Sequence, residues 1–346
     1  MSEIPVGLVG FGLAGRCFHA PVIRAVPGLW LKTIVQRHGD SAREAFPEVS
    51  IARDVDALLA DEEIRLVVIA TPNASHYELA RRCLLAGRDV IVDKPFTVTS
   101  GEASDLIRIA SSQRRLLSAY HNRRFDGDFL TVRQLMAKGA LGRVVRCESR
   151  YDRYRPTLRP GAWRESNEPA GGVLADLGPH LIDQALVLFG APSAVTADIR
   201  IERRGAVVDD AFDITLHYPG LRVQLSATML ACEPGPRFLL YGTGGTYIKY
   251  GMDPQEALLR KGGSPGGPGW GEEDESRWGT LTLAGGVSSR IPTEAGDYRL
   301  FYANVRDAMN GEAELAVTGE QAARVIRVIE LARESNALAR TMDWPL

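Results

Sequence analysis

Lys94 lies in the segment Asp93-Lys94-Pro95, which comes directly after the apolar run at residues 90–92. Much earlier in the chain, a glycine-rich turn at residues 10–15 follows another apolar run, Val6–Val9. The carboxyl ends of parallel strands meet at one edge of a sheet, and dinucleotides bind across that edge. If both runs are parallel strands, the turn holds a dinucleotide there and Lys94 brings an ammonium group beside it. The sequence therefore predicts a cofactor site and a candidate catalytic cation in one crevice.

The glycine-rich turn has the spacing G-x-G-x-x-G, which gains meaning between a strand and a helix. In that setting Gly10 permits a tight turn, Gly12 lets the backbone approach a pyrophosphate, and Gly15 lets the helix pack on the strand. The alternative is a glycine-rich turn without a ligand, and the elements around it favour the cofactor. The contacts expected along this turn are Gly10, Phe11, Gly12, Leu13, Ala14 and Gly15.

Arg37 follows a second apolar run at residues 31–35, where an NAD-selective site carries Asp or Glu for the ribose 2′-hydroxyl. No acid stands there. Arg37, with help from Arg43, could instead pair with a 2′-phosphate. The position favours NADP(H) over NAD(H), and the alternative is an ordinary surface arginine.

A loop after the apolar strand predicted at residues 66–70 is expected beside the nicotinamide ribose. The alternative role for Asn73 is that of a turn residue, with Ser75 as a helix N-cap. With Lys94, the residues expected at this end of the cofactor are Thr71, Pro72, Asn73 and His76.

A second polar group opens an otherwise apolar helix that runs to Phe189. Asp176 and His180 are four residues apart and therefore neighbours on one helix end. We expect Asp176 to cap this helix, with Pro179 in its first turn. A capping Asp176, a partly buried His180 and an exposed Asp183 are the purely structural interpretation of the same residues.

Lys94 and His180 together supply what hydride transfer from an alcohol requires. A histidine with a pKa near neutrality can take the hydroxyl proton. An ammonium group beside the oxygen stabilises the developing alkoxide. Asp176 would orient the histidine or accept from a neighbouring hydroxyl. Lys94 is the alternative base if burial depresses its pKa, and the sequence leaves this choice open.

Two styles of sequence divide the chain. Strands and helices alternate up to about residue 122, which is typical of a doubly wound parallel sheet. Strands without intervening helices then follow one another, which predicts an α+β domain with a mostly antiparallel sheet. We therefore predict a Rossmann dinucleotide-binding domain at residues 1–122. A substrate-binding and oligomerisation domain with a large open sheet is predicted at residues 123–346.

The composition excludes several classes of protein. A formal net charge of −2 and scattered arginines give no field for nucleic acid or an anionic membrane. The four cysteines lie far apart and predict neither a zinc site nor disulfides, so no metal is expected. With no leader segment or membrane-length apolar run, a cytoplasmic protein is expected.

The glycine turn, the Lys94 segment and the pattern G-x-x-x-D-x-G-x-H-x-x-D at residues 172–183 together resemble the Gfo/Idh/MocA oxidoreductases over nearly the whole chain. Residues 12–21, 121–129 and 242–247 are similar to the branch containing scyllo-inositol dehydrogenases. Members commonly have Glu at the position of Asp93. The resemblance implies that Lys94, Asp176 and His180 act at the substrate, and that the open sheet mediates a homodimer or homotetramer.

The position of several polar residues makes them candidates to line the substrate pocket. Tyr151 and Arg153 alternate along a strand predicted at residues 144–154 and so share one face. The full set is His121, Asn122, Arg123, Tyr151, Arg153, Trp163 and Arg164.

The leading hypothesis is an NADP(H)-preferring dehydrogenase that acts on a ring polyol, most readily an inositol. The alternatives are a non-catalytic sensor of cofactor or sugar and a cofactor-retaining glycosidase. The fold alone does not separate these three functions.

Overall fold

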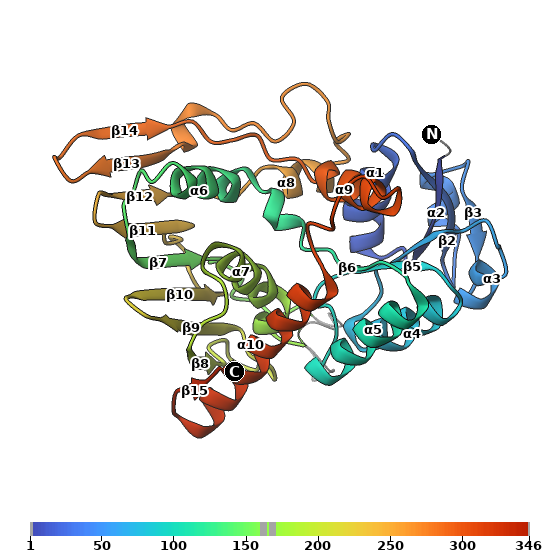
Figure 1. Ribbon diagram of the computed structural model, residues 1–346, viewed down its shortest axis with the longest axis horizontal. Coiled ribbons are helices and arrows are strands. Elements are labelled where there is room, and N and C mark those ends of the chain that lie inside the picture. The colour runs from blue at the N-terminus through green and yellow to red at the C-terminus, as the bar shows by residue number, and fades with distance from the viewer. Residues whose placement is uncertain (1–2, 160–164, 166–170, 345–346) are drawn as a thin grey trace. The chain divides into compact units, whose positions relative to one another are not determined.

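The computed structural model describes residues 3–159, 165 and 171–344 of the 346 in the chain (Figure 1). The chain packs as two units. The first contains Met1–Phe125, Gln255–Trp270 and Asp297–Ala323, and the second contains Asp126–Pro254, Gly271–Gly296 and Arg324–Leu346. The chain first passes from one unit to the other between Phe125 and Asp126, near the boundary predicted at residue 122. Two later segments nevertheless return to the first unit, where they add residues that a single cut of the chain assigns elsewhere.

The first unit is built on a six-stranded parallel sheet, which confirms the predicted doubly wound architecture. Its order is β3-β2-β1-β4-β5-β6, so the order of the strands reverses between β1 and β4. β4 and β5 are buried along their whole length, as expected for strands covered on both faces. The strands are β1 (Ile4–Val9), β2 (Leu29–Val35), β3 (Ser50–Ala52), β4 (Leu66–Ile69), β5 (Asp89–Val92) and β6 (Leu117–Ala119).

Glycine and capping side chains mark the ends of two helices in the first unit. α4 is followed by Gly87 at φ +75°, whose N–H donates to the carbonyl of Leu84. α5 begins with a capping box between Thr99 and Glu102. The helices are the π-helix η1 (Gly15–His19), α1 (Ala20–Arg24), α2 (Ser41–Ala45), α3 (Val55–Leu59), η2 (Asn73–Ser75), α4 (His76–Leu85), α5 (Ser100–Gln113), η3 (Asn122–Phe125), α8 (Gln255–Arg260) and α9 (Arg299–Met309).

The second unit is built on a nine-stranded sheet with the order β14-β13-β12-β11-β7-β10-β9-β8-β15. All its pairings are antiparallel except that of β7 with β10, which confirms the predicted mostly antiparallel sheet. The strands are β7 (Val144–Arg150), β8 (Ala194–Arg200), β9 (Ala211–Tyr218), β10 (Leu221–Thr228), β11 (Phe238–Gly242), β12 (Gly245–Lys249), β13 (Gly279–Leu283), β14 (Ser288–Ile291) and β15 (Met342–Asp343).

The faces of this sheet differ in burial. Along β10, Val223 and Leu225 are buried, whereas Arg222 and Gln224 alternate with them and are more accessible. The apolar helix α7 (Val173–Phe189) packs against β9 and β10. The remaining helices are α6 (Gly127–Ala137), η5 (Glu275–Arg277) and α10 (Gly319–Leu338). One face of β10 therefore faces the core while the other carries polar side chains. Among the residues that the structure describes, none of the helices has the length and apolar character needed to cross a membrane.

Candidate active site

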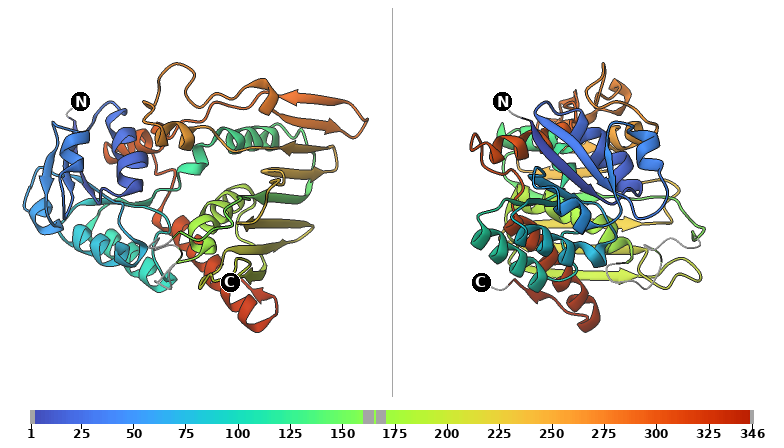
Figure 2. Two further views of the ribbon diagram at one scale, coloured as in Figure 1. Left: turned by 180° about the vertical axis from the view of Figure 1, so that it is seen from behind. Right: turned by 90° about the vertical axis from the view of Figure 1, so that its right-hand side faces the viewer.

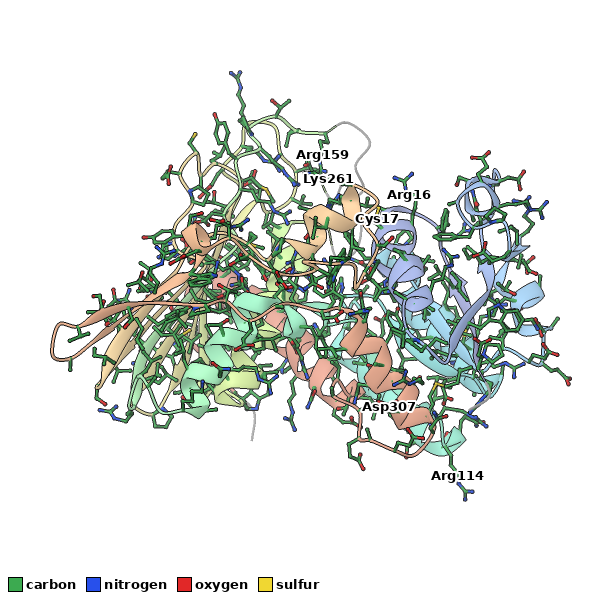
Figure 3. The ribbon with its side chains drawn as sticks, turned by 90° about the horizontal axis from the view of Figure 1, so that it is seen from above. Arg16, Cys17, Arg114, Arg159, Lys261 and Asp307 are labelled. Atoms are coloured by element: carbon green, nitrogen blue, oxygen red, sulfur yellow. The ribbon has the colours of Figure 1, made fainter. Side chains whose placement is uncertain are left out.

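Backbone hydrogen bonds join the loops at the carboxyl edge of the parallel sheet. Beyond the strand ends, the N–H of Ala70 donates to the carbonyl of Val9, and the N–H of Asp93 donates to that of Ile69. The glycine turn, the Thr71 loop and the Lys94 loop therefore follow three neighbouring strands at one edge. Figure 3 shows Arg16, just past the turn, pointing away from its helix. The sequence predicts a dinucleotide at this edge of the sheet, and that placement stays a prediction.

Two glycines of the turn are required by the packing of the protein itself. Gly10 has φ +102°, and a side-chain carbon there would lie 2.6 Å from the carbonyl oxygen of Ala70. A side-chain carbon at Gly15 would lie 2.1 Å from the carbonyl oxygen of Gly10. Both contacts are with backbone, which cannot move aside as a flexible side chain can.

Gly12 differs from the other two glycines of the turn. It is exposed, and a side-chain carbon built on it meets no atom within 4 Å. The fold therefore gives no reason for glycine at this position. A ligand whose phosphates approach the backbone does give one, and the residues present fit a dinucleotide.

The loop after β2 is held by Gln36 and Arg53. Gln36 donates to the carbonyl of His38 and accepts from the N–H of Ala42, both at 2.8 Å. Arg53 pairs with Asp40 at 2.8 Å. The only carboxylate between residues 36 and 41 is thus already neutralised, and the exposed Arg37 stands in a loop of fixed shape.

His76 uses both ring nitrogens inside the first unit. Nδ1 lies 2.9 Å from the carbonyl oxygen of Pro95, and Nε2 lies 2.9 Å from that of Thr71. Burial lowers the pKa of His76, and Asp93 partly opposes this effect. We propose that His76 holds these two loops in place and does not contact the ribose directly.

Ser75 occupies the N-cap position of α4 without capping it. Its hydroxyl donates to the carbonyl of Pro72 at 2.7 Å and lies 2.7 Å from the Thr71 hydroxyl. The expected capping bond is therefore wrong, because a closer backbone acceptor takes the hydroxyl. Asn73 is buried, at 5% exposure, in the same turn.

Lys94 is half-buried at the end of β5, and the Lys94–Pro95 peptide bond is cis. Its N–H donates to the carboxylate of Asp93 at 2.8 Å. Burial alone would raise the pKa of Asp93, but His19, Lys94 and His76 hold it below its usual value. Asp93 is therefore an anion whose carboxylate holds the backbone N–H of Lys94.

Helix α7 does not start where the sequence suggested. It begins at Val173, and the carboxylate of Asp209 accepts from the N–H of Leu174 at 2.6 Å. Asp176 lies one turn further on, so its predicted capping role is wrong and Pro179 lies inside the helix. A cap supplied from a distant loop leaves no local sequence signal.

Asp176 and His180 lie together with two candidate substrate residues in the second unit. Arg153 Nη1 lies 3.9 Å from the carboxylate of Asp176. His180 is buried, and its ring meets the ring of Tyr151 edge-on, with 6.2 Å between centroids. The predicted strand at residues 144–154 ends at Arg150. Tyr151 and Arg153 nevertheless keep alternate backbone hydrogen bonds to β10 and its end.

Arg237 is a buried residue that the sequence did not single out. Its side chain donates to the hydroxyl of Tyr151 at 2.8 Å and to the amide oxygen of Gln184 at 2.5 Å. It also bonds Ser149 and pairs with Asp128 at 3.2 Å. Arg237 therefore fixes the tyrosine that packs on His180.

The other pocket candidates differ in position. His121 is buried, and Asn122 is half-buried at the start of η3. Arg123 is buried and pairs with Glu256 of α8, so its charge is already balanced inside the first unit. Trp163 and Arg164 lie outside the described residues.

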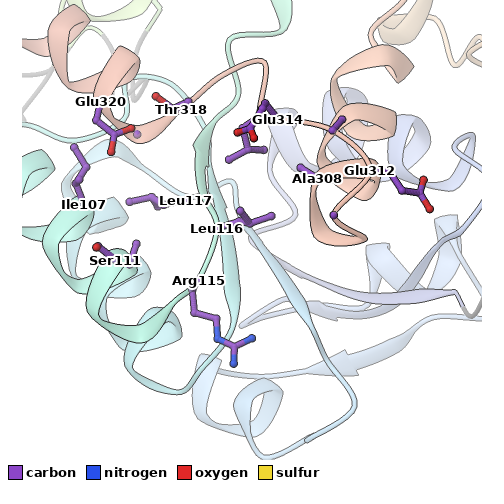
Figure 4. A pocket seen from close by; sticks show the side chains of 15 residues that line it. Ile107, Ser111, Arg115, Leu116, Leu117, Ala308, Glu312, Glu314, Thr318 and Glu320 are labelled. Atoms are coloured by element: carbon purple, nitrogen blue, oxygen red, sulfur yellow. The ribbon is translucent and has the colours of Figure 1, made fainter.

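Lys94 belongs to the first unit, whereas Asp176 and His180 belong to the second. A cavity of about 720 Å³ in the first unit lies away from the Lys94 edge, because Arg115, Leu116 and Leu117 at the amino end of β6 line it (Figure 4). The candidate catalytic groups thus form two clusters. Asp93 contacts Lys94 in the first, and Arg153 and Tyr151 contact Asp176 and His180 in the second.

Comparison with known proteins identifies relatives over the full length of the chain. The uncharacterized oxidoreductase YdgJ of Escherichia coli is 44% identical, covering 96% of each chain. The Bacillus subtilis protein named scyllo-inositol 2-dehydrogenase (NADP(+)) IolW is 37% identical, covering 99% of this chain and 96% of its own. The solved structure of yvaA from Bacillus subtilis has a TM-score of 0.96 at 36% identity and covers 99% of both chains.

Family models account for both parts of the chain. Residues 4–121 match the oxidoreductase family's NAD-binding Rossmann fold, and residues 133–343 match the family's C-terminal alpha/beta domain. The chain is therefore a member of the Gfo/Idh/MocA oxidoreductase family.

Proposed function

We propose that this oxidoreductase transfers a hydride between NADP(H) and a secondary alcohol of a cyclitol or sugar, most readily an inositol. The observation that carries the proposal is Lys94, which stands at the carboxyl edge of a dinucleotide-binding sheet. The relative named as an NADP(+)-dependent scyllo-inositol 2-dehydrogenase supports both the cofactor and the substrate class. Hydroxyl-rich substrates also suit the polar residues around Asp176.

The preference for NADP(H) depends on the loop after β2. Arg37 is exposed there, and the carboxylate that would oppose a phosphate is paired with Arg53. A 2′-phosphate would meet Arg37, with Arg43 also exposed on the following helix. The ribose 2′-hydroxyl of NAD(H) would meet in this loop only the carboxylate of Asp40, which is already paired with Arg53.

Residues of the first unit would hold the cofactor. The backbone at Gly10–Gly15 would carry the pyrophosphate, and the loop at Thr71–Asn73 would lie at the nicotinamide ribose. When bound, the nicotinamide supplies or accepts the hydride. His76 would act through the loops that it joins.

The reaction needs one group that moves a proton and one that stabilises charge on the substrate oxygen. In the oxidation, His180 would take the hydroxyl proton while the Lys94 ammonium stabilises the developing alkoxide. In the reduction, the same groups would return the proton and polarise the carbonyl. Asp176 would accept from a neighbouring hydroxyl or orient His180. Lys94 remains the alternative proton acceptor.

Some of the predicted substrate residues remain candidates for direct contact with the substrate. His121 and Asn122 are candidates from the first unit, and Arg153 is a candidate from the second. Tyr151 and Arg123 would act indirectly, since Arg237 holds the hydroxyl of Tyr151 and Glu256 pairs with Arg123. Trp163 and Arg164 stay candidates on sequence position alone.

The exposed face of the nine-stranded sheet is proposed as the surface of a homodimer or homotetramer. Tyr241 on β11 is 39% exposed. Arg146, its partner in register on β7, is also exposed. Sedimentation equilibrium tests this part, and replacing Tyr241 with glutamate should reduce the mass to that of a monomer.

The enzymatic test follows reduced-nicotinamide absorbance with NADP⁺ or NAD⁺ across scyllo-inositol, myo-inositol and common aldoses. Turnover of a cyclitol with NADP⁺ supports the proposal. Turnover only with NAD⁺ would keep the enzyme and refute the role of Arg37. Tight cofactor binding without turnover across the panel would favour a sensor or a cofactor-retaining glycosidase.

Two variants sharpen this test. Arg37→Ala should weaken NADP⁺ binding by about 10-fold or more while changing NAD⁺ binding little, and Arg222→Ala in the second unit is the matched control. Lys94→Ala should keep cofactor binding and lose nearly all turnover. Normal turnover of Lys94→Ala would contradict the catalytic assignment.

A further inference from the structure

His19 is a buried histidine that the proposed reaction does not use. It ends the π-helix η1 with no exposed surface. Its Nδ1 lies 2.6 Å from the hydroxyl of Tyr302, and its Nε2 lies 3.8 Å from the carboxylate of Asp93. Its ring also stacks obliquely on Tyr120, with 4.3 Å between centroids. His19 thus contacts residues from three segments that are distant from it in sequence, and one of them is Asp93, the neighbour of Lys94.

The surroundings of the ring favour one tautomer. Nε2 of His19 has no hydrogen-bond partner among the described residues other than the carboxylate that it faces across 3.8 Å. Burial raises the pKa of Tyr302 well above its usual value, so the phenol keeps its proton and can donate it to Nδ1. Nδ1 is then the acceptor, and Nε2 carries the ring proton toward Asp93.

We propose that His19 is a positioning residue for Lys94 that acts through the carboxylate of Asp93. This inference rests on the proposed function, in which Lys94 contacts the substrate. The chain of contacts runs from Tyr302 to His19, from His19 to Asp93, and from Asp93 to the N–H of Lys94 at 2.8 Å.

The half-buried carboxylate of Asp93 needs this support because loss of contact with water opposes its charge. The charged or titratable groups that face Asp93 are His19, Lys94 and His76. Each ring nitrogen of His76 faces a backbone carbonyl oxygen at 2.9 Å, Nδ1 that of Pro95 and Nε2 that of Thr71, so neither is turned to Asp93. His19 is therefore the histidine with a nitrogen left for Asp93, and it holds the carboxylate in the orientation that receives the Lys94 N–H.

Tyr302 links a later segment of the chain to the surroundings of His19. It lies on α9, which belongs to the segment Asp297–Ala323 that returns to the first unit. Tyr302 is fully buried, and its ring lies 5.5 Å from that of Tyr120 by centroids. The returning segment thereby supplies a hydrogen-bond partner for a residue directly behind the Lys94 loop.

The first experiment reads the tautomer of His19 without any substrate. The protein has six histidines, and two-bond proton–nitrogen spectra of ¹⁵N-histidine-labelled protein separate their tautomers. His19→Gln assigns the His19 signal by its loss. We expect the Nε2–H form in the wild-type protein and a changed Nε2 shift in Asp93→Asn. The Nδ1–H form, or a signal unaffected by Asp93→Asn, would overturn the proposal.

The second experiment is a double-mutant cycle in kcat with His19→Gln and Asp93→Asn. Each single variant should lower kcat by roughly 10- to 100-fold with the NADPH dissociation constant changed less than about twofold. Because His19 acts through Asp93, the double variant should be little worse than Asp93→Asn alone. Losses that multiply, or normal kcat in His19→Gln, would refute the proposal.

Two further variants serve as controls for these experiments. Tyr302→Phe keeps the imidazole while removing its Nδ1 partner, so it should alter the His19 tautomer signal even if His19→Gln folds poorly. An unchanged signal counts against the proposal. His217→Gln lies in the second unit and should leave the His19 signal and kcat unchanged. If the wild-type protein turns over none of the cyclitols, the proposed function fails while the tautomer measurement still decides the role of His19.

Discussion

The guanidinium of Arg237 lies 4.1 Å from the centre of the Tyr151 ring and also donates to the hydroxyl of that tyrosine. Both side chains are buried. Tyr151 is thus fixed by its face and by its hydroxyl at once, while its ring meets His180. Tyr151 is therefore held against the candidate base, and its predicted contact with the substrate stays a prediction.

Replacing Arg237 with methionine should destabilise the protein strongly. The change leaves the fully buried carboxylate of Asp128 without its ion-pair partner. Breaking a buried pair in this way typically costs about 3–5 kcal/mol of unfolding free energy. Urea denaturation measures the loss, with the exposed Arg204→Met in a loop of the second unit as control, which should change stability by less than about 0.5 kcal/mol. Equal effects of the two variants would show that the Arg237 contacts contribute little.

Gly172 and Gly190 bracket α7 and allow a matched comparison. Both have positive φ, but a side-chain carbon at Gly172 would lie 2.2 Å from the Asp209 carboxylate, whereas one at Gly190 meets nothing within 4 Å. Both alanine variants bear backbone strain of about 1–3 kcal/mol. Gly172→Ala also displaces the cap of α7, so it should cost about 0.5–2 kcal/mol more in thermal or urea unfolding. If Gly190→Ala lowers the free energy of unfolding more than Gly172→Ala does, the Asp209 cap contributes less stability than expected.

The cap of α7 is an example of a feature that could not be predicted from the sequence. Local signals were sufficient for the parallel sheet, for the Gly87 helix end and for the edge that carries Lys94. Asp209 and Arg237 act on α7 and Tyr151 from distant strands and loops, and only the tertiary fold makes those pairings. Tyr302 reaches His19 across 283 positions, and no periodicity or spacing in the sequence encodes such a contact.

Gly12 and Gly15 should separate cofactor binding from folding. Gly12→Ala places its new carbon in open space, so unfolding free energy should change by less than about 0.5 kcal/mol. NADPH binding, followed by the cofactor's fluorescence, should nevertheless weaken by about 10-fold or more, because the added methyl lies where phosphates approach. Gly15→Ala instead forces its carbon to 2.1 Å from a backbone oxygen and should lower stability. Unchanged NADPH affinity in Gly12→Ala would place the phosphates elsewhere.

The buried His76 should make the protein less stable as the solution becomes acidic. Burial lowers the pKa of His76 from its ordinary value of 6.5. Below about pH 6.5 the unfolded chain therefore binds a proton that the folded chain does not. The free energy of unfolding consequently decreases as the pH is lowered. Asp93, whose folded pKa is also lowered, adds a loss of the same sign only in the lower window below about 3.8.

Urea unfolding from pH 7.5 to pH 5 isolates the histidine effect. Burial and Arg222 also lower the pKa of His217, so the comparison belongs in a His217→Gln background. There, His76→Gln should flatten the decline below pH 6.5, because the proton uptake on unfolding is removed. His38→Gln changes an exposed histidine and should leave the profile as it was. A decline of the same slope with and without His76 would mean that groups other than His76 govern the loss of stability in acid.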